Sequence, residues 1–362
     1  MARKRQIPIA KRHNVNDDAD STTTSDQETR VKQAFYTVRG AAREVLRIED
    51  APSPTPGPGE VAIRIHASGV NPSDVKTRAG SNGPLTMPRT IPHNDGAGIV
   101  TAVGAGVPAR RVGERVWLYN VNRTADGAGQ GPRGTAAEEI VTDAKLAVPL
   151  PHGVSFEAAA CLGVPAMTAH RCVMADGRLD GQTVLVTGGA GAVGAMAIQI
   201  ARWAGARVIV TVSSDEKAAA ARADGADATI NYKAEDVASR ALALNGGKRI
   251  DRIVDVDFAA NTELATKILK TSGTIASYAS ATSRTPTIPF GTLMFMDTTV
   301  RMVLVYVMPQ SAKEAAARDI NAMLETGALT PRIAATFPLS EIVAAHEMQE
   351  KGTHIGNVVL KV

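Results

Sequence analysis

A glycine-rich turn between two apolar runs constrains this chain more than any other part of its sequence. Residues 183–186 are apolar or β-branched and predict a buried parallel strand. Residues 195–204 predict a helix, and residues 208–212 predict a second strand. A Gly-x-Gly-x-x-Gly motif spans residues 189–194, at the turn between the first strand and the helix. This order of elements predicts a βαβ unit that binds a dinucleotide.

Each glycine of the motif has its own expected role. We expect Gly189 to permit the tight turn, Gly191 to let the backbone approach a pyrophosphate, and Gly194 to let the helix pack closely. The backbone amides of Ala192 and Val193 should then donate to the pyrophosphate at the start of the helix. A glycine turn with no ligand is the alternative, and the strands on both sides of the helix argue against it.

Length, charge and cysteine content narrow the class of protein. A chain of 362 residues can form two domains with full cores, and a net charge of +4 does not by itself indicate a nucleic-acid partner. The only cysteines, Cys161 and Cys172, form no Cys-x-x-Cys pair. We therefore expect a cytoplasmic protein with neither a disulfide framework nor a zinc knuckle. The sequence has no run of about 18 apolar residues, which predicts that no segment spans a membrane.

The first part of the chain differs from the rest in composition. Residues 1–30 combine basic side chains with a stretch rich in Asp, Ser and Thr, and they show no hydrophobic periodicity. Such a segment cannot bury apolar surface, so we predict a disordered tail. Its basic half leaves open the alternative of an arm that contacts nucleic acid.

Short strands and turns follow the tail. Residues 52–59 hold four prolines and predict a rigid connection. Apolar side chains alternate over residues 60–67, which predicts a half-buried strand. Further short apolar runs separated by glycines predict a compact, barrel-like β domain before the nucleotide site.

Five ordered blocks of sequence resemble one known superfamily. The chain is similar to the medium-chain dehydrogenases/reductases, and within them to the zinc-independent, zeta-crystallin-like quinone reductases. The resemblance extends over residues 34–362. It is carried by the Gly189 motif together with residues 69–80, 91–104, 112–117 and 352–360.

The resemblance implies an α/β fold with two domains. A GroES-like β-barrel catalytic domain would be built from both ends of the chain, residues 31–157 and 308–362. A Rossmann domain with a doubly wound parallel sheet, residues 158–307, would be inserted between them and bind NADP. The periodicity of residues 313–324 and 341–349 predicts helices in the returning part.

The residues at the expected metal position do not match those of the zinc alcohol dehydrogenases in this superfamily. Asn71 and Asn94 stand where those enzymes have a cysteine and a histidine, and His93 and Asp95 are the only other ligand types nearby. A catalytic zinc needs three protein ligands, so we expect no metal. Without zinc to stabilise an alkoxide, the natural acceptors of a hydride are quinones and activated enones, which stabilise their own anions.

The residues beyond the second strand of the βαβ unit favour NADPH. An NAD-preferring site places an acidic residue at the end of this strand, where the chain has Ser213, which leaves room for a 2′-phosphate. In the reductases that this chain resembles, a Lys and a Tyr hold that phosphate, and Lys217 and Tyr232 occupy those places. A solvated lysine and a strand-end tyrosine are the alternative reading.

The resemblance also assigns residues around the nicotinamide. Asn71 matches an Asn beside the cofactor and substrate, and we take it, Lys76 and Arg78 of the same loop as candidate catalytic residues. Many quinone reductases have Tyr at the position of Lys76, and some alkenal-reducing relatives have Lys.

More distant positions complete the predicted site. Thr168 matches a Thr that faces the cofactor, Tyr278 ends a strand near the nicotinamide half, and Asn357 stands where relatives often have Lys. His93 is a candidate proton donor at the cleft, whereas His346 is expected to be structural.

The first hypothesis is therefore an NADPH-dependent quinone reductase that works without a metal. Reduction of α,β-unsaturated aldehydes or ketones is the second, and a non-catalytic, zeta-crystallin-like RNA-binding or structural role is the third. We predict a long apolar strand over residues 299–307. In the family the equivalent strands of two subunits pair, so we also predict a homodimer through residues 300–307. The Gly-rich segment 120–134 is a candidate cover of the site.

Overall fold

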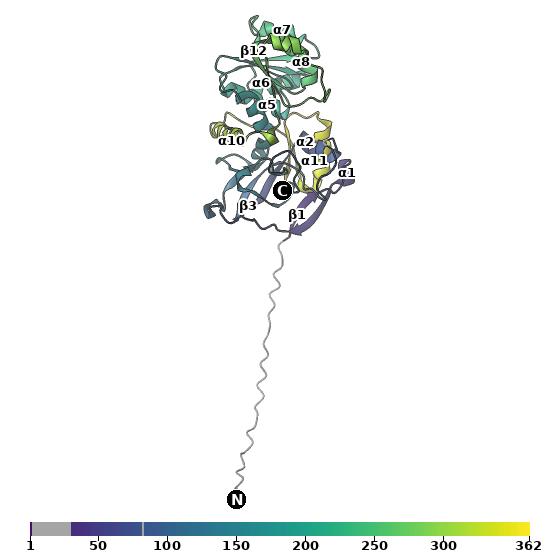
Figure 1. Ribbon diagram of the computed structural model, residues 1–362, viewed down its shortest axis with the longest axis vertical. Coiled ribbons are helices and arrows are strands. Elements are labelled where there is room, and N and C mark those ends of the chain that lie inside the picture. Colours follow the sequence, from purple (N-terminus) through teal and green to yellow (C-terminus); the bar gives the residue numbers. More distant parts are fainter. Residues whose placement is uncertain (2–29, 82) are drawn as a thin grey trace.

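The computed structural model describes residues 1, 30–81 and 83–362. Its two larger sheets belong to two parts of the molecule that lie one above the other in Figure 1. Helices α5, α6, α7 and α8 and strand β12 lie at one end, and strands β1 and β3 lie at the other, with α10 between them. Nearly all of the predicted tail, residues 1–30, lies outside the described residues. Arg30 does not belong to it, because it begins strand β1 (Arg30–Phe35).

The inserted part forms a six-stranded, entirely parallel sheet with the order β10-β9-β8-β11-β12-β13. This is a doubly wound Rossmann order, because β8 lies inside the sheet and the chain builds outward from it in both directions. The four residues of β8 are buried, as the apolar run predicts. The strands are β8 (Thr183–Val186), β9 (Arg207–Val212), β10 (Ala228–Asn231), β11 (Ile250–Asp255), β12 (Leu269–Ser277) and β13 (Thr299–Met302).

Helices connect these strands on the two faces of the sheet, as parallel pairing requires. The predicted helix after the glycine turn is confirmed and begins three residues earlier, at Ala192, because Gly191 takes the extended cap position. The helices are α5 (Ala192–Trp203), α6 (Asp215–Ala223), α7 (Val237–Leu244), α8 (Phe258–Ile268) and α9 (Phe290–Phe295).

The remaining strands form a mostly antiparallel, GroES-like sheet of seven strands and a two-stranded sheet of β1 and β2. In the central strand β3, Val61, Ile63 and Ile65 are buried, as their alternation predicts. The last strand of the chain pairs with β3, which joins the two ends of the sequence in one sheet. The strands are β2 (Arg47–Pro52), β3 (Glu60–Val70), β4 (Asp95–Val103), β5 (Arg115–Leu118), β6 (Glu139–Asp143), β7 (Ala147–Pro149), β14 (Ile333–Pro338) and β15 (Asn357–Lys361).

Helices around this sheet carry or support several of the predicted site residues. They are α1 (Ala42–Val45), α2 (Pro72–Ala79), α3 (Phe156–Ala159), α4 (Met167–Met174), α10 (Gln310–Glu325) and α11 (Ile342–Lys351). Short helical turns add η1 (Ala109–Arg111), η2 (Ala144–Leu146), η3 (Leu162–Ala166), η4 (Val305–Val307) and η5 (Leu339–Glu341). The predicted helices in the returning part are confirmed as α10 and α11, with slightly different ends.

One hydrophobic core runs through the junction of the two sheets. It contains Trp117 of the antiparallel sheet, Met167 of α4, Met196 of α5 and Ile320 of α10. Helix α10 packs against α4 in this core.

The predicted strand over residues 299–307 is wrong in its second half. Strand β13 ends at Met302, and residues 305–307 form the 3₁₀ turn η4. Val305 and Tyr306 are buried in this turn and lie in the shared core. Packing of these two side chains therefore outweighs the β propensity of the apolar run.

Candidate functional site

The glycine turn joins β8 to α5 at the carboxyl end of the parallel strands, and its glycines divide their roles differently from the prediction. The residue with a left-handed backbone is Gly188, with φ of 65°, rather than Gly189. Gly189 is required because a Cβ there would lie 1.9 Å from Cγ1 of Val210 on β9. The expectation that Gly189 supplies the tight turn is therefore wrong, and its place against β9 is the physical reason for a glycine.

The other two glycines fit their predicted roles. A Cβ on Gly194 would lie 2.5 Å from the Gly188 carbonyl oxygen, so helix and turn could not pack as they do. A Cβ on Gly191 would meet only that same oxygen, at 3.4 Å, and Gly191 is exposed. The backbone at Gly191 is therefore open to a ligand from outside.

The start of α5 offers hydrogen-bond donors at this turn. The first helical hydrogen bond runs from the Ala195 amide to the Gly191 carbonyl, at 2.9 Å. The amides of Ala192, Val193 and Gly194 precede it and belong to the open end of the helix. Free amides and the positive end of the helix dipole suit a phosphate group, so the turn fits the pyrophosphate of a dinucleotide.

Ser213, Lys217 and Tyr232 come together beside this turn. The Tyr232 amide donates to the Val212 carbonyl at 3.1 Å, which places the end of β10 next to the end of β9. Ser214 caps α6 by accepting a hydrogen bond from the Lys217 amide at 3.3 Å. The Tyr232 side chain is 51% exposed and thus accessible. The three predicted residues therefore share one edge of the sheet.

His354 also lies near Lys217, which the sequence does not indicate. Burial lowers the pKa of His354, and the positive charge of Lys217 lowers it further. The loop before β15 therefore approaches the start of α6.

Tyr278 and Thr168 lie farther along the parallel sheet. The Tyr278 amide, just after β12, donates to the Asp255 carbonyl at 3.1 Å, and burial raises the pKa of the Tyr278 hydroxyl. Thr168 lies in the first turn of α4 and is buried.

Asp255, which was not among the predicted site residues, connects these strand ends by hydrogen bonds. The buried Asp255 carboxyl accepts hydrogen bonds from the hydroxyls of Thr187, at 2.9 Å, and Ser277, at 3.0 Å. Burial is the main reason that its pKa is raised. The available signal was an acidic residue directly after the apolar pair Ile253 and Val254.

The Asn357 side chain makes a contact within the protein. Its Nδ2 donates to the Arg332 carbonyl at 2.9 Å, and its own backbone amide donates to the same oxygen. The described contact of this side chain therefore holds β15 to the chain before β14, and it does not by itself indicate a cofactor role.

The candidate catalytic region lies at the end of β3, where Asn71 begins α2. Asn71 Nδ2 donates to Asp95 Oδ2 at 2.7 Å, and the Asn71 amide donates to Asp74 Oδ2 at 2.9 Å. Asn94 Nδ2 donates to the other oxygen of Asp74 at 2.8 Å. These four residues, hereafter the Asn71–Asp95 cluster, are all buried.

Burial changes the acidity of both carboxyl groups in the cluster. It raises the pKa of Asp74 to about 6 and that of Asp95 well above its ordinary value. The Asp95 Oδ1 atom has no hydrogen-bond partner among the described residues, and Oδ2 accepts the Val164 amide at 2.7 Å. A Cβ on Gly163 would lie 2.0 Å from that Oδ1. The cluster is therefore a closed, desolvated support for Asn71.

Lys76 and Arg78, which lie two residues apart on α2, have different environments. The Lys76 side chain is exposed. Arg78 has no exposed side-chain surface: its guanidinium donates to the Gly40 carbonyl and forms an ion pair with Glu350. A side chain without exposed surface cannot touch a substrate, so the structure contradicts a direct catalytic role for Arg78.

His93 and His346 form a buried pair beside this helix. Their Nε2 atoms are 2.9 Å apart, and His93 Nδ1 lies 2.8 Å from the Ser68 hydroxyl. Both ring nitrogens of His93 therefore have partners inside the protein. This arrangement does not support the predicted proton donor, and it agrees with a structural role for His346.

The ligand types at this site do not fit a catalytic zinc ion. In the described part of the chain, no three His, Cys, Asp or Glu side chains gather in a way that could hold a metal. Both cysteines are buried, and burial raises the pKa of Cys172 to about 12, which disfavours the thiolate that metals bind.

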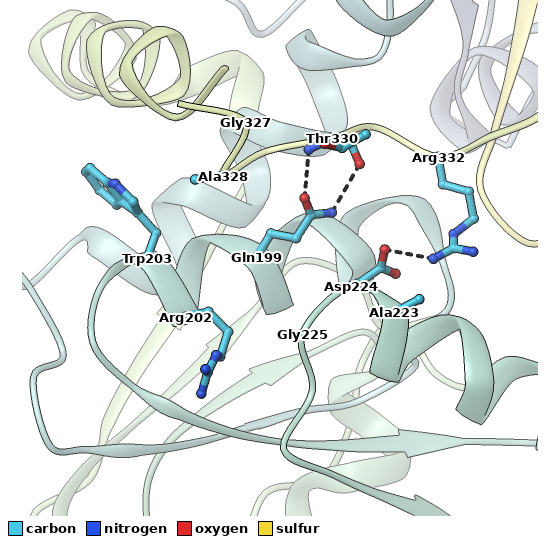
Figure 2. A pocket seen from close by; sticks show the side chains of 10 residues that line it. All are labelled: Gln199, Arg202, Trp203, Ala223, Asp224, Gly225, Gly327, Ala328, Thr330 and Arg332. Atoms are coloured by element: carbon cyan, nitrogen blue, oxygen red, sulfur yellow. Dashed lines mark hydrogen bonds and ion pairs between the residues drawn. The ribbon is translucent and has the colours of Figure 1, made fainter. Parts of the chain in front are cut away.

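Figure 2 shows a surface hollow of about 660 Å³ that does not coincide with the predicted dinucleotide site. It lies between α5, the end of α6 and the chain that links α10 to β14. Gln199 exchanges two hydrogen bonds with the backbone of Thr330, and Arg332 pairs with Asp224. These contacts join α5 and α6 to the returning chain, and the hollow contains no predicted site residue.

None of the helices in the residues that the structure describes has the length and apolar character needed to cross a bilayer.

Comparison with known proteins assigns both parts of the chain to families. Residues 57–152 match the family described as alcohol dehydrogenase GroES-like domain, and residues 192–321 match the family described as zinc-binding dehydrogenase.

Two curated relatives have names that bear on activity. The chain is 31% identical over 321 residues to a quinone oxidoreductase of Pseudomonas aeruginosa, with 88% of this chain and 95% of the relative covered. It is 30% identical over 315 residues to a 2-haloacrylate reductase of Burkholderia, with 84% and 92% covered.

Solved structures share the whole fold. A quinone oxidoreductase of Escherichia coli in complex with NADPH is 25% identical, has a TM-score of 0.79, and covers 91% of this chain and 100% of its own. An NAD-dependent alcohol dehydrogenase is 31% identical with a TM-score of 0.81, and 91% of this chain and 99% of that chain are covered.

Proposed function

The chain belongs to the zeta-crystallin-like quinone oxidoreductase branch of the medium-chain dehydrogenase/reductase superfamily, and from this premise we propose that it reduces quinones with NADPH without a metal ion. The membership makes it an oxidoreductase. The observation that carries the choice of cofactor is the meeting of Ser213, Lys217 and Tyr232 at adjacent strand ends, beside the open amides of α5.

The three residues suit the phosphate that distinguishes NADPH from NADH. Lys217 would neutralise its charge, the accessible Tyr232 hydroxyl would donate to it, and the small side chain of Ser213 leaves space for it. The Escherichia coli relative was solved with NADPH, which supports this choice. Asp215 and Glu216 also lie in the first turn of α6. The proposal requires that the attraction of the 2′-phosphate to Lys217 outweighs its repulsion by these two carboxylates.

When bound, the nicotinamide supplies the hydride, and the residues of this chain bind and orient the two reactants. Ala192, Val193 and Gly194 would hold the pyrophosphate through their amides. We propose that the buried Asn71 positions the loop that begins α2 next to the acceptor, because the Asn71–Asp95 cluster fixes its side chain at the end of β3.

We infer metal independence from the ligand types that the chain offers. The Asp95 Oδ2 atom, one of the few candidate metal ligands, already accepts hydrogen bonds from Asn71 Nδ2 and the Val164 amide. His93 is held by Ser68 and His346. The acceptor must then stabilise its own developing anion, which a quinone does.

A panel of quinones and enones with NADPH and NADH tests the proposal. We expect turnover of 1,4-benzoquinone with NADPH, unchanged by extensive treatment with a metal chelator. A tenfold preference for NADH, which corresponds to about 1.4 kcal/mol, would refute the roles of Lys217 and Tyr232. Loss of activity on chelation, restored by zinc, would refute metal independence.

Reduction of an activated alkene is the second candidate function. The similarity to a 2-haloacrylate reductase supports it, and so does the exposed Lys76, because some alkenal-reducing members of the family have Lys at this position. A higher kcat/KM for an alkenal or a haloacrylate than for any quinone in the same panel would favour this function.

We also propose that two copies of the chain pair through the β13 edge and that the protein works in the cytoplasm. Strand β13 is an edge strand, and large apolar side chains near it are exposed: Phe295 by 86% and Met302 by 64%. A second copy would cover this surface and pair the open edge. The two free cysteines suit a reducing compartment.

A further inference from the structure

A second pocket, of about 500 Å³, lies between the segment 120–134, the turn η4 and helix α10. We call it the lobe pocket. None of the residues to which the proposed reaction was assigned lines it. The side chains that matter for its chemistry are Asn120, Arg123, Arg133, Lys145, Tyr306 and Lys313.

The segment 120–134 is held against η4 by a close backbone contact. Gly127 has φ of 75°, and a Cβ there would lie 2.0 Å from the Tyr306 carbonyl oxygen. The tip of the segment can approach η4 this closely only because it carries a glycine. This contact closes one side of the lobe pocket.

Arg123 is fixed in the wall of the lobe pocket. Its guanidinium carbon lies 3.5 Å from the centre of the Tyr306 ring, and its Nε donates to Asn94 Oδ1 at 3.2 Å. The Tyr306 hydroxyl in turn donates to the Ser73 hydroxyl at 2.7 Å. The stacked ring and the single Nε bond orient the guanidinium and leave its two terminal nitrogens for another partner.

The charges that line the lobe pocket are unbalanced. Arg133 pairs with Glu60 at 2.6 Å, and Lys145 lies 4.0 Å from Asp143. Within residues 30–81 and 83–362, neither Arg123 nor Lys313 has a carboxylate within ion-pair distance. Lys313 Nζ donates to the Tyr306 carbonyl at 2.9 Å, and burial lowers its pKa. Arg123 acts electrostatically on the buried Asp74 and Asp95, whose pKa values its positive charge lowers. Lys313 is partly desolvated without such a partner among the described residues, which is costly unless a ligand supplies a counter-charge.

Asn120 adds an unsatisfied polar group to the same pocket. It is 4% exposed and has a left-handed backbone with φ of 57°. Among the described residues its Oδ1 has no hydrogen-bond partner. Asn adopts the left-handed region more readily than most residues. The unpaired buried oxygen is therefore the feature that a ligand would satisfy.

We propose that the lobe pocket binds a small organic anion through a carboxylate or phosphate group held by Arg123 and Lys313. The planar guanidinium matches two oxygens of either group, and the ammonium group adds a point charge. The Asn120 amide would contact a hydroxyl or amide elsewhere on the ligand. The Asn94 contact of Arg123 links this site to the Asn71–Asp95 cluster.

Calorimetric titration of the full-length protein with inorganic phosphate and with succinate tests this site at low ionic strength. We expect both Arg123→Gln and Lys313→Gln to weaken binding of at least one probe tenfold or more. The stronger probe identifies the preferred head group. Thermal unfolding of each variant verifies its fold, and Lys313→Gln keeps the test valid if Arg123→Gln does not fold.

Lys217→Gln is the matched control, because it removes a cation from the dinucleotide site instead. If Lys217→Gln loses binding while Arg123→Gln and Lys313→Gln bind as tightly as the unmodified protein, the anion binds at the dinucleotide site and the proposal is overturned. Equal affinity in all four proteins, or no binding by the unmodified protein, would also overturn it. The titration measures binding and not turnover, so its result does not depend on whether the protein catalyses the proposed reaction.

Discussion

The Nε2 atoms of His93 and His346 lie 2.9 Å apart, and this contact joins the start of β4 to α11 across 253 positions of sequence. The rings are stacked, with centroids 5.1 Å apart. On one side Ser68 and Thr135 continue the network, and on the other Arg78 reaches Glu350. Helix α2, which carries the candidate catalytic loop, is thereby held to the last helix of the chain.

This histidine pair predicts a loss of stability in acid. Burial lowers the pKa of His93 to about 3 and that of His346 well below its ordinary value. The unfolded chain therefore binds more protons below about pH 6.5, so the stability is complete above that pH and falls as the pH falls. By pH 5 we expect His93 to account for a loss of about 2 kcal/mol, and His346 to add to it in the same direction. Asp74 and Asp95 act in the opposite direction, because their raised pKa values favour the fold in acid.

Urea unfolding between pH 7 and pH 5 measures this effect in the unmodified protein and in two variants. We expect His346→Gln to show a shallower loss of stability than the unmodified protein, since one buried histidine is gone. His152→Gln, at an exposed position, is the control and should leave the slope unchanged. The same slope in all three proteins would contradict the prediction.

Two alanine substitutions in the glycine turn should have separate effects. Gly189→Ala forces a Cβ against Val210 and should reduce the free energy of unfolding by about 1–3 kcal/mol. Gly191→Ala adds a Cβ that makes only an ordinary contact, 3.4 Å from the Gly188 carbonyl oxygen, so the fold should remain stable while the Kd for NADPH rises. Thermal unfolding and fluorescence titration with NADPH measure the two quantities. An unchanged Kd in Gly191→Ala would contradict the proposal that the pyrophosphate binds at this turn.

Removal of the Lys217 charge should change the choice of cofactor. We expect Lys217→Ala to raise the KM for NADPH tenfold or more and to leave the KM for NADH nearly unchanged, because only NADPH carries the 2′-phosphate. Lys248→Ala, an exposed lysine just before β11, is the matched control and should change neither value. A parallel rise in both KM values would mean that Lys217 acts on a group that the two cofactors share.

Lys76 and Arg78 allow catalysis and stability to be separated on one helix. Arg78→Gln leaves Glu350 without its ion pair and the Gly40 carbonyl with a weaker donor, and because Glu350 is partly exposed we expect a loss of about 1–3 kcal/mol in stability. Lys76→Gln should leave stability unchanged, so any effect on kcat/KM would come from a lost contact between Lys76 and the substrate. Steady-state rates and denaturant unfolding of both variants distinguish these outcomes. Unchanged stability in Arg78→Gln would refute the structural role.

A charge on the β13 edge should prevent the proposed pairing. Met302 is exposed on this strand, so Met302→Glu places like charges opposite each other in a symmetric dimer. We expect light scattering at micromolar concentration to give a dimer for the unmodified protein and a monomer for Met302→Glu. Val112→Glu, at an exposed apolar position in the turn between η1 and β5, controls for a general effect of charge. A monomeric unmodified protein would refute the dimer.

Local sequence pattern predicted the first βαβ unit of the parallel sheet well, because β8 and β9 are short apolar runs whose period and glycine turn need no distant information. The Gly189 motif, the helix after it and the order of strand, helix and strand are all confirmed in β8, α5 and β9. The division of labour between Gly188 and Gly189 could not be predicted, because it depends on the approach of Val210 from the next strand.

The sequence by itself determined the superfamily, the glycine turn and the absence of the usual zinc ligands at Asn71 and Asn94. The tertiary structure alone decided that Arg78 is buried, that residues 305–307 leave the sheet, and that His93 faces His346. The physical reason is the range of the interactions involved. Periodicity and turn chemistry act between near neighbours in the chain, whereas desolvation of Arg78 and pairing of His93 depend on α11, more than 250 residues away.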